Sequence, residues 1–580
     1  MKKWKKAACL LLATCLVLGG CMPKEEQLGP MEDTEEDTVS LGTTDYYDME
    51  YTACDGDELY ELIDQIRDLM EDADNADDVI DLFYQAEDLE GEIASNYELV
   101  DLYTYIDVTD EYYEEECNRM YDLYLDVDDA IGALGRDLLS SACGDAVREA
   151  WSQDYIDYYE NFEEMTEEQH ALFAREQELV LEYEEAAAAD YTVDVNGIEY
   201  DIYDLAYDDS LSYMDYLDYY MQLTKEENDV LGPIYVELVG IRQDIAASYG
   251  YDSYIDYCYD YVYERDYTAE DAQELCDAVK EDFYPALSAV SNYYDYYAIA
   301  DLDQLIADMP VNQMMKQVKA YLDQVDDSLV DNFEYMQSYH LYNLDYSDAK
   351  YDGGFTTLLS GYNEPFLYNN PEGDFYDMMS LVHEFGHFNA FCENINTASI
   401  QNLDLAEIHS QGLEFLYLSF YEDMLGEEYS EAAADYTLYQ KVNTVISGCL
   451  YDEFQREVYS LEDPTLEEIN ALYAEIASEY GYVYSFYGYT EAYEWVEIPH
   501  NYNNPLYYIS YTMSVLPSFE IWMQSQEDFD EACASYLAIV EAGETGGYLE
   551  TLEEVGLTSP FSDGYIEDLS DAIVSYYKNR

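Results

Sequence analysis

Apolar residues recur every three or four positions over most of the segment 57–342. One such stripe consists of Leu59, Leu62, Ile63, Ile66 and Leu69. Similar stripes run through 89–106, 120–139, 214–231 and 315–322. This spacing places the apolar side chains on one face of an α-helix. Because proline is also sparse in this segment, the pattern predicts a helical body.

A short break in this helical pattern lies at 193–200. Apolar residues alternate there on both sides of the step Asn196-Gly197. The Asn-Gly step suits a two-residue turn in which both residues have positive φ. The break therefore predicts a small β-hairpin.

The pattern changes again after Tyr342. The segment 351–361 is bounded by glycines and rich in threonine, and the apolar run 365–368 follows it. Short runs of this kind between turn residues predict two strands. After a turn at 369–373, a helix is expected to begin near Asp377. Its apolar face is supplied by Met378, Leu381, Val382, Phe385 and Phe388.

This predicted helix also carries the run His383-Glu384-Phe385-Gly386-His387. Two histidines at positions i and i+4 lie on one face of a helix, so both can bind the same metal ion. Glu384 follows the first histidine and can reach a water molecule on that ion. The pattern predicts a zinc site with His383 and His387 as ligands and Glu384 as general base.

A catalytic zinc ion usually has three protein ligands and one position for water. Glu407 lies twenty residues after His387, in a segment with helical apolar spacing. Asp404, His409 and Glu414 lie in the same segment and are rivals for the third position. Spacing alone leaves this choice open.

The N-terminus has the features of an export signal. Four lysines lie among the first six residues, and an apolar run of 14 residues covers 7–20. This run is too short to span a bilayer. Its end, Leu18-Gly19-Gly20-Cys21, resembles the lipobox of bacterial lipoproteins, in which the signal is cut before a diacylated cysteine. An ordinary signal peptide with a chance cysteine is the alternative.

The lipobox resemblance implies a lipoprotein signal peptide over 1–20 and a lipid-modified Cys21. The protein would then be anchored at the outer face of the bacterial cytoplasmic membrane. The segment 21–50 is acidic and interrupted by Pro23, Gly29, Pro30 and Gly42, so we expect a flexible tether.

The charge excludes other classes of function. The 580 residues include 131 acidic and 21 basic ones, giving a formal net charge of −110. Nucleic-acid binding needs clustered Lys and Arg, so it is excluded as a main activity. Hydrophobic residues make up 49% of the chain, which excludes a disordered acidic tail. The eight cysteines after Cys21 are scattered, and we expect most of them to be buried thiols.

Together these motifs resemble the thimet oligopeptidase / oligoendopeptidase F family of zinc metallopeptidases. That family has a His-Glu-Phe/Leu-Gly-His helix and then a helix with Glu-x-x-Ser-Gln-x-x-Glu. Glu407, Ser410, Gln411 and Glu414 match the second pattern position by position. The resemblance implies that Glu407 is the third ligand of one Zn²⁺ per chain.

Two flanking blocks extend the resemblance. Upstream, 350–355 looks like the Lys-x-x-Gly-Ala-Tyr/Phe strand region that lines the cleft of the family. Downstream, Pro499-His500 and the tyrosine-rich segment 507–511 look like the segments that bind the substrate and the oxyanion. The resemblance implies such roles for the following residues: His500, Tyr511, Tyr508 and, less directly, Tyr502.

The resemblance also implies a fold and an activity. The fold would be mainly α, with a large two-lobed helical body around a deep substrate cleft and a small β-sheet beside the zinc helix. A helical N-terminal lobe would cover 51–340 and a catalytic zinc-peptidase region 341–580. The activity would be hydrolysis of internal bonds in short peptides.

Two alternatives remain at this point. One is a zinc carboxypeptidase with a similar helical body, and the other is a non-catalytic peptide-binding lipoprotein that retains a peptidase body. Recognition of a peptide C-terminus favours Arg or Lys. Only five such residues occur from 341 onward, namely Lys350, Lys441, Arg456, Lys578 and Arg580. This scarcity favours an endopeptidase.

Overall fold

The computed structural model describes residues 40–162, 165–187, 189, 191–208, 210–307, 309–351, 353–397, 402–481 and 493–580. The predicted signal peptide 1–20, Cys21 and the tether up to residue 39 lie outside the described residues. The described chain is mostly helical, with two small sheets. The predicted mainly α fold is confirmed.

The described residues form two compact units, each made of two separate segments. The α15 unit comprises the described residues of Met22–Met165 and Ala307–Gln401. The α16 unit comprises those of Thr166–Ile306 and Asn402–Arg580. The predicted N-terminal lobe 51–340 and catalytic region 341–580 are functional regions of the sequence, whereas these units are defined by compactness. The two regions therefore stay predictions.

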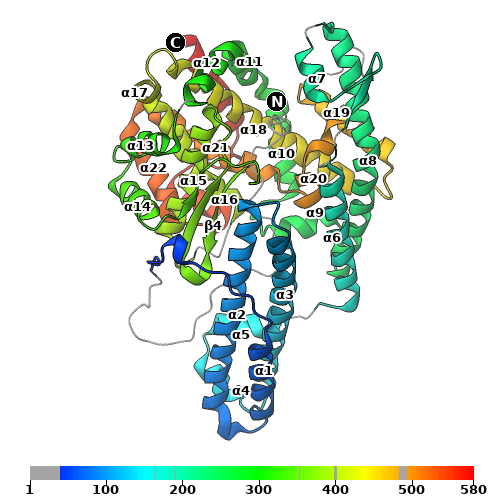
Figure 1. Cartoon of the computed structure of the whole chain (residues 1–580), viewed down its shortest axis with the longest axis vertical. Coiled ribbons are helices and arrows are strands. Elements are labelled where there is room, and N and C mark those ends of the chain that lie inside the picture. Colours follow the sequence, from blue (N-terminus) through cyan, green and yellow to red (C-terminus); the bar gives the residue numbers. More distant parts are fainter. Residues whose placement is uncertain are drawn as a thin grey trace. The chain divides into compact units, whose positions relative to one another are not determined.

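The helices of the α15 unit include three that pack side by side (Figure 1). Its helices are η1 (Tyr46–Asp48), α1 (Asp57–Leu69), η2 (Ala73–Asn75), α2 (Ala76–Ile106), α3 (Glu111–Ser140), α4 (Gly144–Ala150), α5 (Gln153–Asn161), α13 (Val311–Leu322), α14 (Asp327–Ser338), η4 (Ser360–Tyr362) and α15 (Phe375–Glu393). The stripe predicted for α1 faces the α1–α3 core, where Leu59, Ile63 and Ile66 are buried. Gly135 of α3 permits close packing, because a Cβ there would lie 2.2 Å from the Tyr159 ring.

A three-stranded sheet lies beside α15 in the same unit. It contains β3 (Tyr342–Asn343), β4 (Gly354–Leu359) and β5 (Glu364–Asn369), with β5 in the middle. β4 and β5 are antiparallel, and Thr356 is paired with Leu367. Every residue of β5 is buried. Because α15 packs on both β4 and β5, the sheet positions the residues of β4 against this helix.

The segment 40–50, predicted to be the end of the flexible tether, packs within the α15 unit. The N–H of Gly42 donates to the carbonyl of Asn363 at 3.0 Å, and the N–H of Thr44 donates to Glu364 at 2.9 Å. A Cβ on Gly42 would lie 2.1 Å from the carbonyl oxygen of Tyr362. This close approach explains why glycine occupies position 42. The two hydrogen bonds hold the segment in place.

The α16 unit contains the remaining helices. They are α6 (Glu167–Ala187), α7 (Ile202–Tyr207), α8 (Tyr213–Ser248), α9 (Tyr254–Asp256), the π-helix η3 (Tyr257–Val262), α10 (Ala269–Asp282), α11 (Tyr284–Tyr293), α12 (Tyr296–Ala307), α16 (Leu403–Tyr417), η5 (Leu418–Phe420), α17 (Tyr421–Leu425), α18 (Ser430–Tyr459), α19 (Leu466–Glu479), η7 (Glu494–Glu497), α20 (His500–Asn503), α21 (Ile509–Glu527), α22 (Phe529–Ala542), α23 (Tyr548–Val555) and α24 (Tyr565–Asn579).

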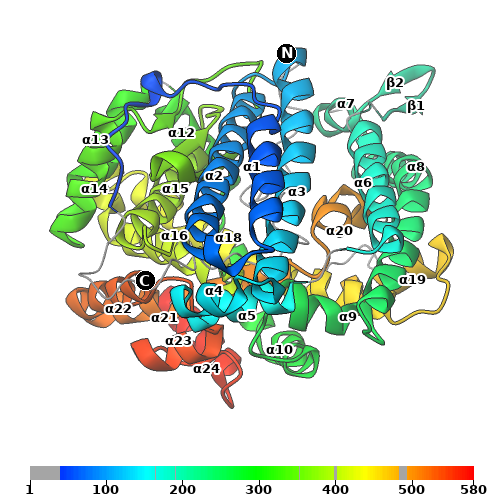
Figure 2. The same cartoon turned by 90° about the horizontal axis from the view of Figure 1, so that it is seen from below.

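The predicted hairpin is present in the α16 unit. β1 (Val193–Val195) pairs with β2 (Ile198–Tyr200) in antiparallel fashion. Asn196 and Gly197 have φ values of 57° and 88°, as this turn requires. The hairpin projects beyond α7 near one end of α8 (Figure 2).

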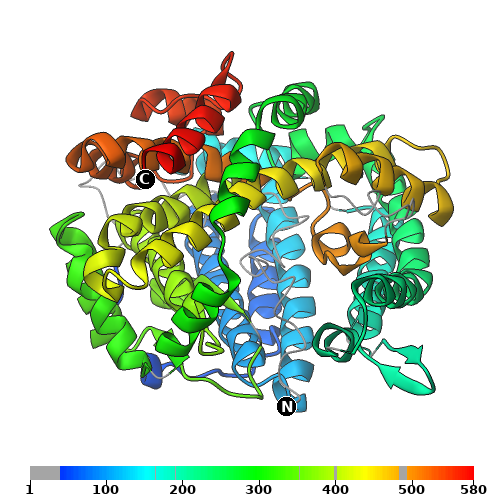
Figure 3. The same cartoon turned by 90° about the horizontal axis from the view of Figure 1, so that it is seen from above.

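The core of the α16 unit is built around α21. α16, α18 and α22 each pack against α21. The orange and red helices α21–α24 gather on one side of the unit (Figure 3). α21 therefore links the helix that carries Glu407 with the rest of the C-terminal helices.

Two further observations concern the environment of the chain. Among the described residues, no helix has the length and apolar character needed to cross a membrane. The eight described cysteines are all free thiols, and six of them are buried. This agrees with the expectation of buried thiols.

Candidate active site

Helix α15 is buried on almost every side along its length. It begins with a capping box, in which the Asp374 carboxylate accepts a hydrogen bond from the N–H of Asp377 and the Asp377 carboxylate accepts one from the N–H of Asp374. His383 and His387 lie one turn apart on this helix, and their ring centroids are 5.0 Å apart. The predicted helix and the shared face of its two histidines are both present.

Glu384 lies between the two histidines and is held by the neighbouring strand. Its side chain is only 3% exposed. The hydroxyl of Thr356 on β4 donates to the Glu384 carboxylate at 3.0 Å and to the carbonyl oxygen of Glu384 at 2.9 Å. A carboxylate held in this way loses rotational freedom before it acts. Thr356 could not be identified from the sequence, because nothing in the pattern of β4 distinguishes it from Thr357.

Glu407 is oriented by a serine on its own helix. α16 begins after Asn402, whose side chain accepts a hydrogen bond from the N–H of Asp404. The Ser410 hydroxyl donates to the Glu407 carboxylate at 2.9 Å and to the carbonyl oxygen of Glu407 at 3.0 Å. Both residues are buried. Each of the two carboxylates, Glu384 and Glu407, therefore accepts a hydrogen bond from a buried hydroxyl.

The three rivals of Glu407 have other partners in the α16 unit. Asp404 lies 3.6 Å from Nε of Arg265. Glu414 accepts a hydrogen bond from Lys441 at 2.7 Å. Nδ1 of His409 lies 3.1 Å from Glu544, and the His409 side chain is fully buried. It is buried because α22 and the turn after it cover this face of α16.

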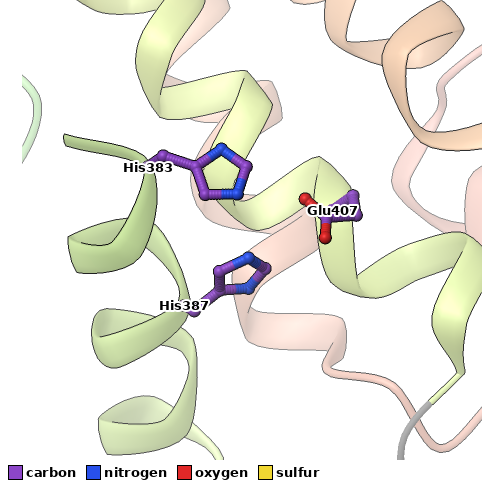
Figure 4. Close-up of side chains that lie close together, drawn as sticks. All are labelled: His383, His387 and Glu407. Carbon is purple, nitrogen blue, oxygen red and sulfur yellow. The ribbon is translucent and has the colours of Figure 1, made fainter. Parts of the chain in front are cut away.

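The ligand atoms of His383, His387 and Glu407 all lie within 4.8 Å of one another. Figure 4 shows the two imidazole rings on one helix and the carboxylate on another. Two imidazoles and one carboxylate are a donor set that suits Zn²⁺ at a catalytic site. The residues present thus fit the ion that the sequence predicted.

His500 and Tyr511 form a buried pair in the α16 unit. Nε2 of His500 and the Tyr511 hydroxyl are hydrogen-bonded at 3.1 Å. Burial raises the pKa of Tyr511 well above its usual value, and the nearby Glu407 carboxylate contributes to this shift. The Tyr511 phenol therefore keeps its proton at neutral pH and can donate a hydrogen bond.

The two other tyrosines of the prediction differ from each other. Tyr508 is partly exposed, and its ring packs edge-on against His500 at 4.9 Å and Tyr511 at 5.3 Å. Tyr502 is fully buried and stacks on Tyr183, with ring centroids 3.6 Å apart. Tyr508 thus lies with the His500–Tyr511 pair, whereas Tyr502 belongs to the packed core.

Lys350, at the start of the upstream block, has a local role. Its ammonium group donates to the carbonyl oxygens of Asp345 and Asn369 and to the side chain of Asn343. Burial lowers the pKa of Lys350 to about 8. Lys350 thus ties the loop before β4 to the end of β5.

Known proteins resemble this chain in sequence and in fold. Residues 46–187 match the Peptidase M3 N-terminal domain. The resemblance to the oligopeptidase family is confirmed. No curated protein matches the chain. The M3 match supports a metallopeptidase.

Solved structures agree on the fold. PZ peptidase A, solved with an inhibitor, is 20% identical and superimposes with a TM-score of 0.70, covering 92% of this chain and 99% of its own. A protein provisionally named oligoendopeptidase F is 21% identical, with a TM-score of 0.71 and coverage of 93% and 99%. A similarly named protein from Bacillus anthracis str. Ames is 20% identical, with a TM-score of 0.69 and the same coverage. The chain thus has the oligoendopeptidase F fold.

Proposed function

We propose that this protein is a zinc-dependent oligoendopeptidase that hydrolyses internal bonds of short peptides. The observation that carries the proposal is the cluster of His383, His387 and Glu407 ligand atoms. Glu384 lies within the same helical turn as the first histidine and is held by Thr356. The match to the M3 peptidases supports the same reaction class.

His383, His387 and Glu407 would hold the ion. A zinc ion bound there supplies a Lewis acid for the peptide carbonyl and lowers the pKa of a water molecule. Ser410 fixes the direction of the Glu407 carboxylate, because its hydroxyl bonds to one oxygen. Such supporting bonds usually raise the affinity of a ligand set for its metal.

The remaining residues move or hold protons. Glu384 accepts the proton of the attacking water at its carboxylate and passes it to the leaving amine. With Nε2 of His500 protonated and donating to the Tyr511 oxygen, the Tyr511 hydroxyl donates its own hydrogen to the oxyanion. A donor fixed before the reaction stabilises the developing charge without reorganisation.

The basic residues support endopeptidase rather than carboxypeptidase action. Four of the five from 341 onward bind other groups of the chain, namely Lys350, Lys441, Arg456 and Arg580. Lys578 is exposed in the last helix, α24. A carboxypeptidase would need a cation for the substrate carboxylate.

The lipobox resemblance supports a lipid anchor on Cys21 at the outer face of the bacterial cytoplasmic membrane. The test is incorporation of labelled palmitate by cells that produce the full chain or its Cys21→Ala variant. Label in the parent alone, with the protein in the membrane fraction, supports the anchor. Equal labelling of both, or of neither, contradicts it.

Hydrolysis of an internally quenched peptide of about eight residues, blocked at both ends, tests the proposed function. The lipid-free protein is compared with its Glu384→Gln variant, and zinc content is measured on both. Cleavage by the parent alone, with about one zinc ion in each, supports the proposal. Zinc in both without cleavage indicates a carboxypeptidase or a binding protein. The same peptide with a free C-terminus distinguishes these two, because only a carboxypeptidase would cleave it. Absence of zinc from both contradicts the metal site.

A further inference from the structure

The segment between His500 and Tyr511 has a strained backbone. It consists of α20, a turn, and the first residues of α21. Leu506 in this turn has a φ of 61°, which a residue with a branched side chain rarely adopts. Such a conformation persists only when surrounding groups hold it in place.

Two groups hold the main chain of Leu506 itself. Nη2 of Arg265 donates to the Leu506 carbonyl oxygen at 2.9 Å. The Leu506 N–H donates to Oε1 of Gln455 at 2.6 Å. Tyr263 acts one residue earlier, where its hydroxyl donates to the Pro505 carbonyl oxygen at 2.8 Å. The N–H and the carbonyl oxygen of Leu506 and the carbonyl oxygen of Pro505 are thus all hydrogen-bonded to side chains.

The position of Arg265 depends on two uncommon backbone features just before it, a π-helix and a residue with positive φ. Arg265 follows the π-helix η3 and Glu264, which has a φ of 47°. The N–H of Arg265 donates to the carbonyl oxygen of Tyr259 at 2.8 Å, which turns the chain inward. The guanidinium then lies 4.4 Å from the Tyr259 ring centroid and 4.6 Å from that of Tyr263. Its side chain is 1% exposed, so this cation is fully withdrawn from solvent.

Arg265 also contacts the helices that carry two predicted site residues. Its Nε lies 3.6 Å from Asp404, in the first turn of α16 and one turn before Glu407. Its Nη2 lies 3.1 Å from the Ser510 hydroxyl, beside Tyr511 at the start of α21. One planar group therefore spans the beginnings of both helices. A lysine, with a single ammonium nitrogen, lacks this fork geometry.

We propose that Arg265 is a positioning residue, which holds the His500–Tyr511 pair in register with Glu407. This inference rests on the proposed peptidase function, since the pair would act on the oxyanion. Arg265 is buried with its guanidinium against main-chain and helix-end groups, so it acts through Tyr511 and not on the substrate.

The kinetic test is a double-mutant cycle of Arg265→Gln with Tyr511→Phe on the end-blocked peptide. Arg265→Gln should lower kcat about ten-fold with KM changed less than about two-fold, because a misplaced group loses rate rather than binding. In the Tyr511→Phe background, the same substitution should change kcat less than about two-fold. Equal losses in both backgrounds would overturn the proposal, because they would mean a general structural role.

The control is Arg175→Gln, which removes an exposed arginine of α6 in the same unit. It should leave kcat and KM unchanged. If Arg265→Gln does not fold, Arg265→Lys and Ser510→Ala take its place in the cycle. Arg265→Lys removes the fork geometry and Ser510→Ala removes one partner of the fork, while both keep the site filled.

A second readout does not depend on activity. The histidine ¹³Cε1 signals of the full chain are few, and that of His500 is assigned by its loss in His500→Gln. Arg265→Gln should move the His500 signal, whereas Arg175→Gln should not. If the parent cleaves no peptide, the proposed function fails, and this signal still decides whether Arg265 positions His500. An unmoved signal would overturn the inference in either case.

Discussion

The hydroxyl of Thr356 donates a hydrogen bond of 3.0 Å to the carboxylate of Glu384, across the contact between β4 and α15. The single hydrogen of this hydroxyl is shared with the carbonyl oxygen of the same residue, 2.9 Å away. Because both residues are buried, water cannot replace this interaction. Thr356 therefore fixes the rotamer of the proposed general base.

Thr356→Val should lower kcat about ten-fold and leave zinc content unchanged. Valine keeps the shape of threonine but removes the hydroxyl, so Glu384 loses its fixed direction and the strand keeps its packing. The matched control is Thr357→Val, since neighbouring residues of a strand point to opposite faces. The control should retain parental activity on the quenched peptide. A loss of the same size in both variants would mean that β4 itself had been disturbed.

Ser410→Ala should weaken zinc binding about 10-fold to 100-fold, because the Glu407 carboxylate loses the hydroxyl that orients it. Competition with a chromogenic chelator measures the zinc dissociation constant. Ser518→Ala serves as the control, since Ser518 is a buried helical serine whose hydroxyl donates to the carbonyl oxygen of Ser514. Unchanged zinc affinity in Ser410→Ala would contradict the role of Ser410 in orienting the Glu407 carboxylate.

The parts of the site that the sequence predicted are those set by local geometry. His383 and His387 are four residues apart on one helix, so any helix there places their rings on one face. Asn196 and Gly197 likewise define their turn with no help from distant residues. Helical periodicity was enough to predict the helical body over 57–342, since it reports which face of each helix is buried.

The parts that the sequence did not predict depend on contacts between distant residues. Thr356 lies 28 residues from Glu384, and Arg265 lies 241 residues from Leu506. Apolar spacing carries no information on which polar groups meet in the core. The sequence also does not distinguish a tyrosine of the packed core, such as Tyr502, from one that lies beside His500, such as Tyr508. Both occur in the same tyrosine-rich stretch.

Acidic groups in the α15 unit should make its stability fall as the pH rises. Burial raises the pKa of Glu98 to about 7, although Ser360 donates two hydrogen bonds to it. Between pH 4.5 and 7, the folded form keeps a proton that the unfolded chain has released. The free energy of unfolding therefore decreases through this window, and Glu98 contributes about 1–3 kcal/mol to the decrease.

Glu98→Gln should remove that contribution, so the variant gains stability relative to the parent at pH 8 but not at pH 4.5. Urea unfolding followed by tryptophan fluorescence measures the midpoint at both values. Trp151 is a suitable reporter because it is buried in the α1–α3 core of the same unit. Glu92→Gln, at an exposed position of α2, should keep the parental pH dependence. A pH dependence that is identical in Glu98→Gln and the parent would contradict the assignment to Glu98.

Tyr511→Phe should lower kcat about 100-fold to 1,000-fold, as expected for loss of one fixed oxyanion donor. The phenol is buried, hydrogen-bonded to His500 and kept protonated by its raised pKa, so its hydroxyl is the group that the substitution removes. Tyr508→Phe should cost less than about ten-fold, since the Tyr508 ring supports His500 by edge-on packing that phenylalanine retains. Zinc content and KM should stay at parental values in both variants. If Tyr508→Phe instead has the larger effect, the donor is Tyr508, and the Tyr511 hydroxyl serves only to hold His500.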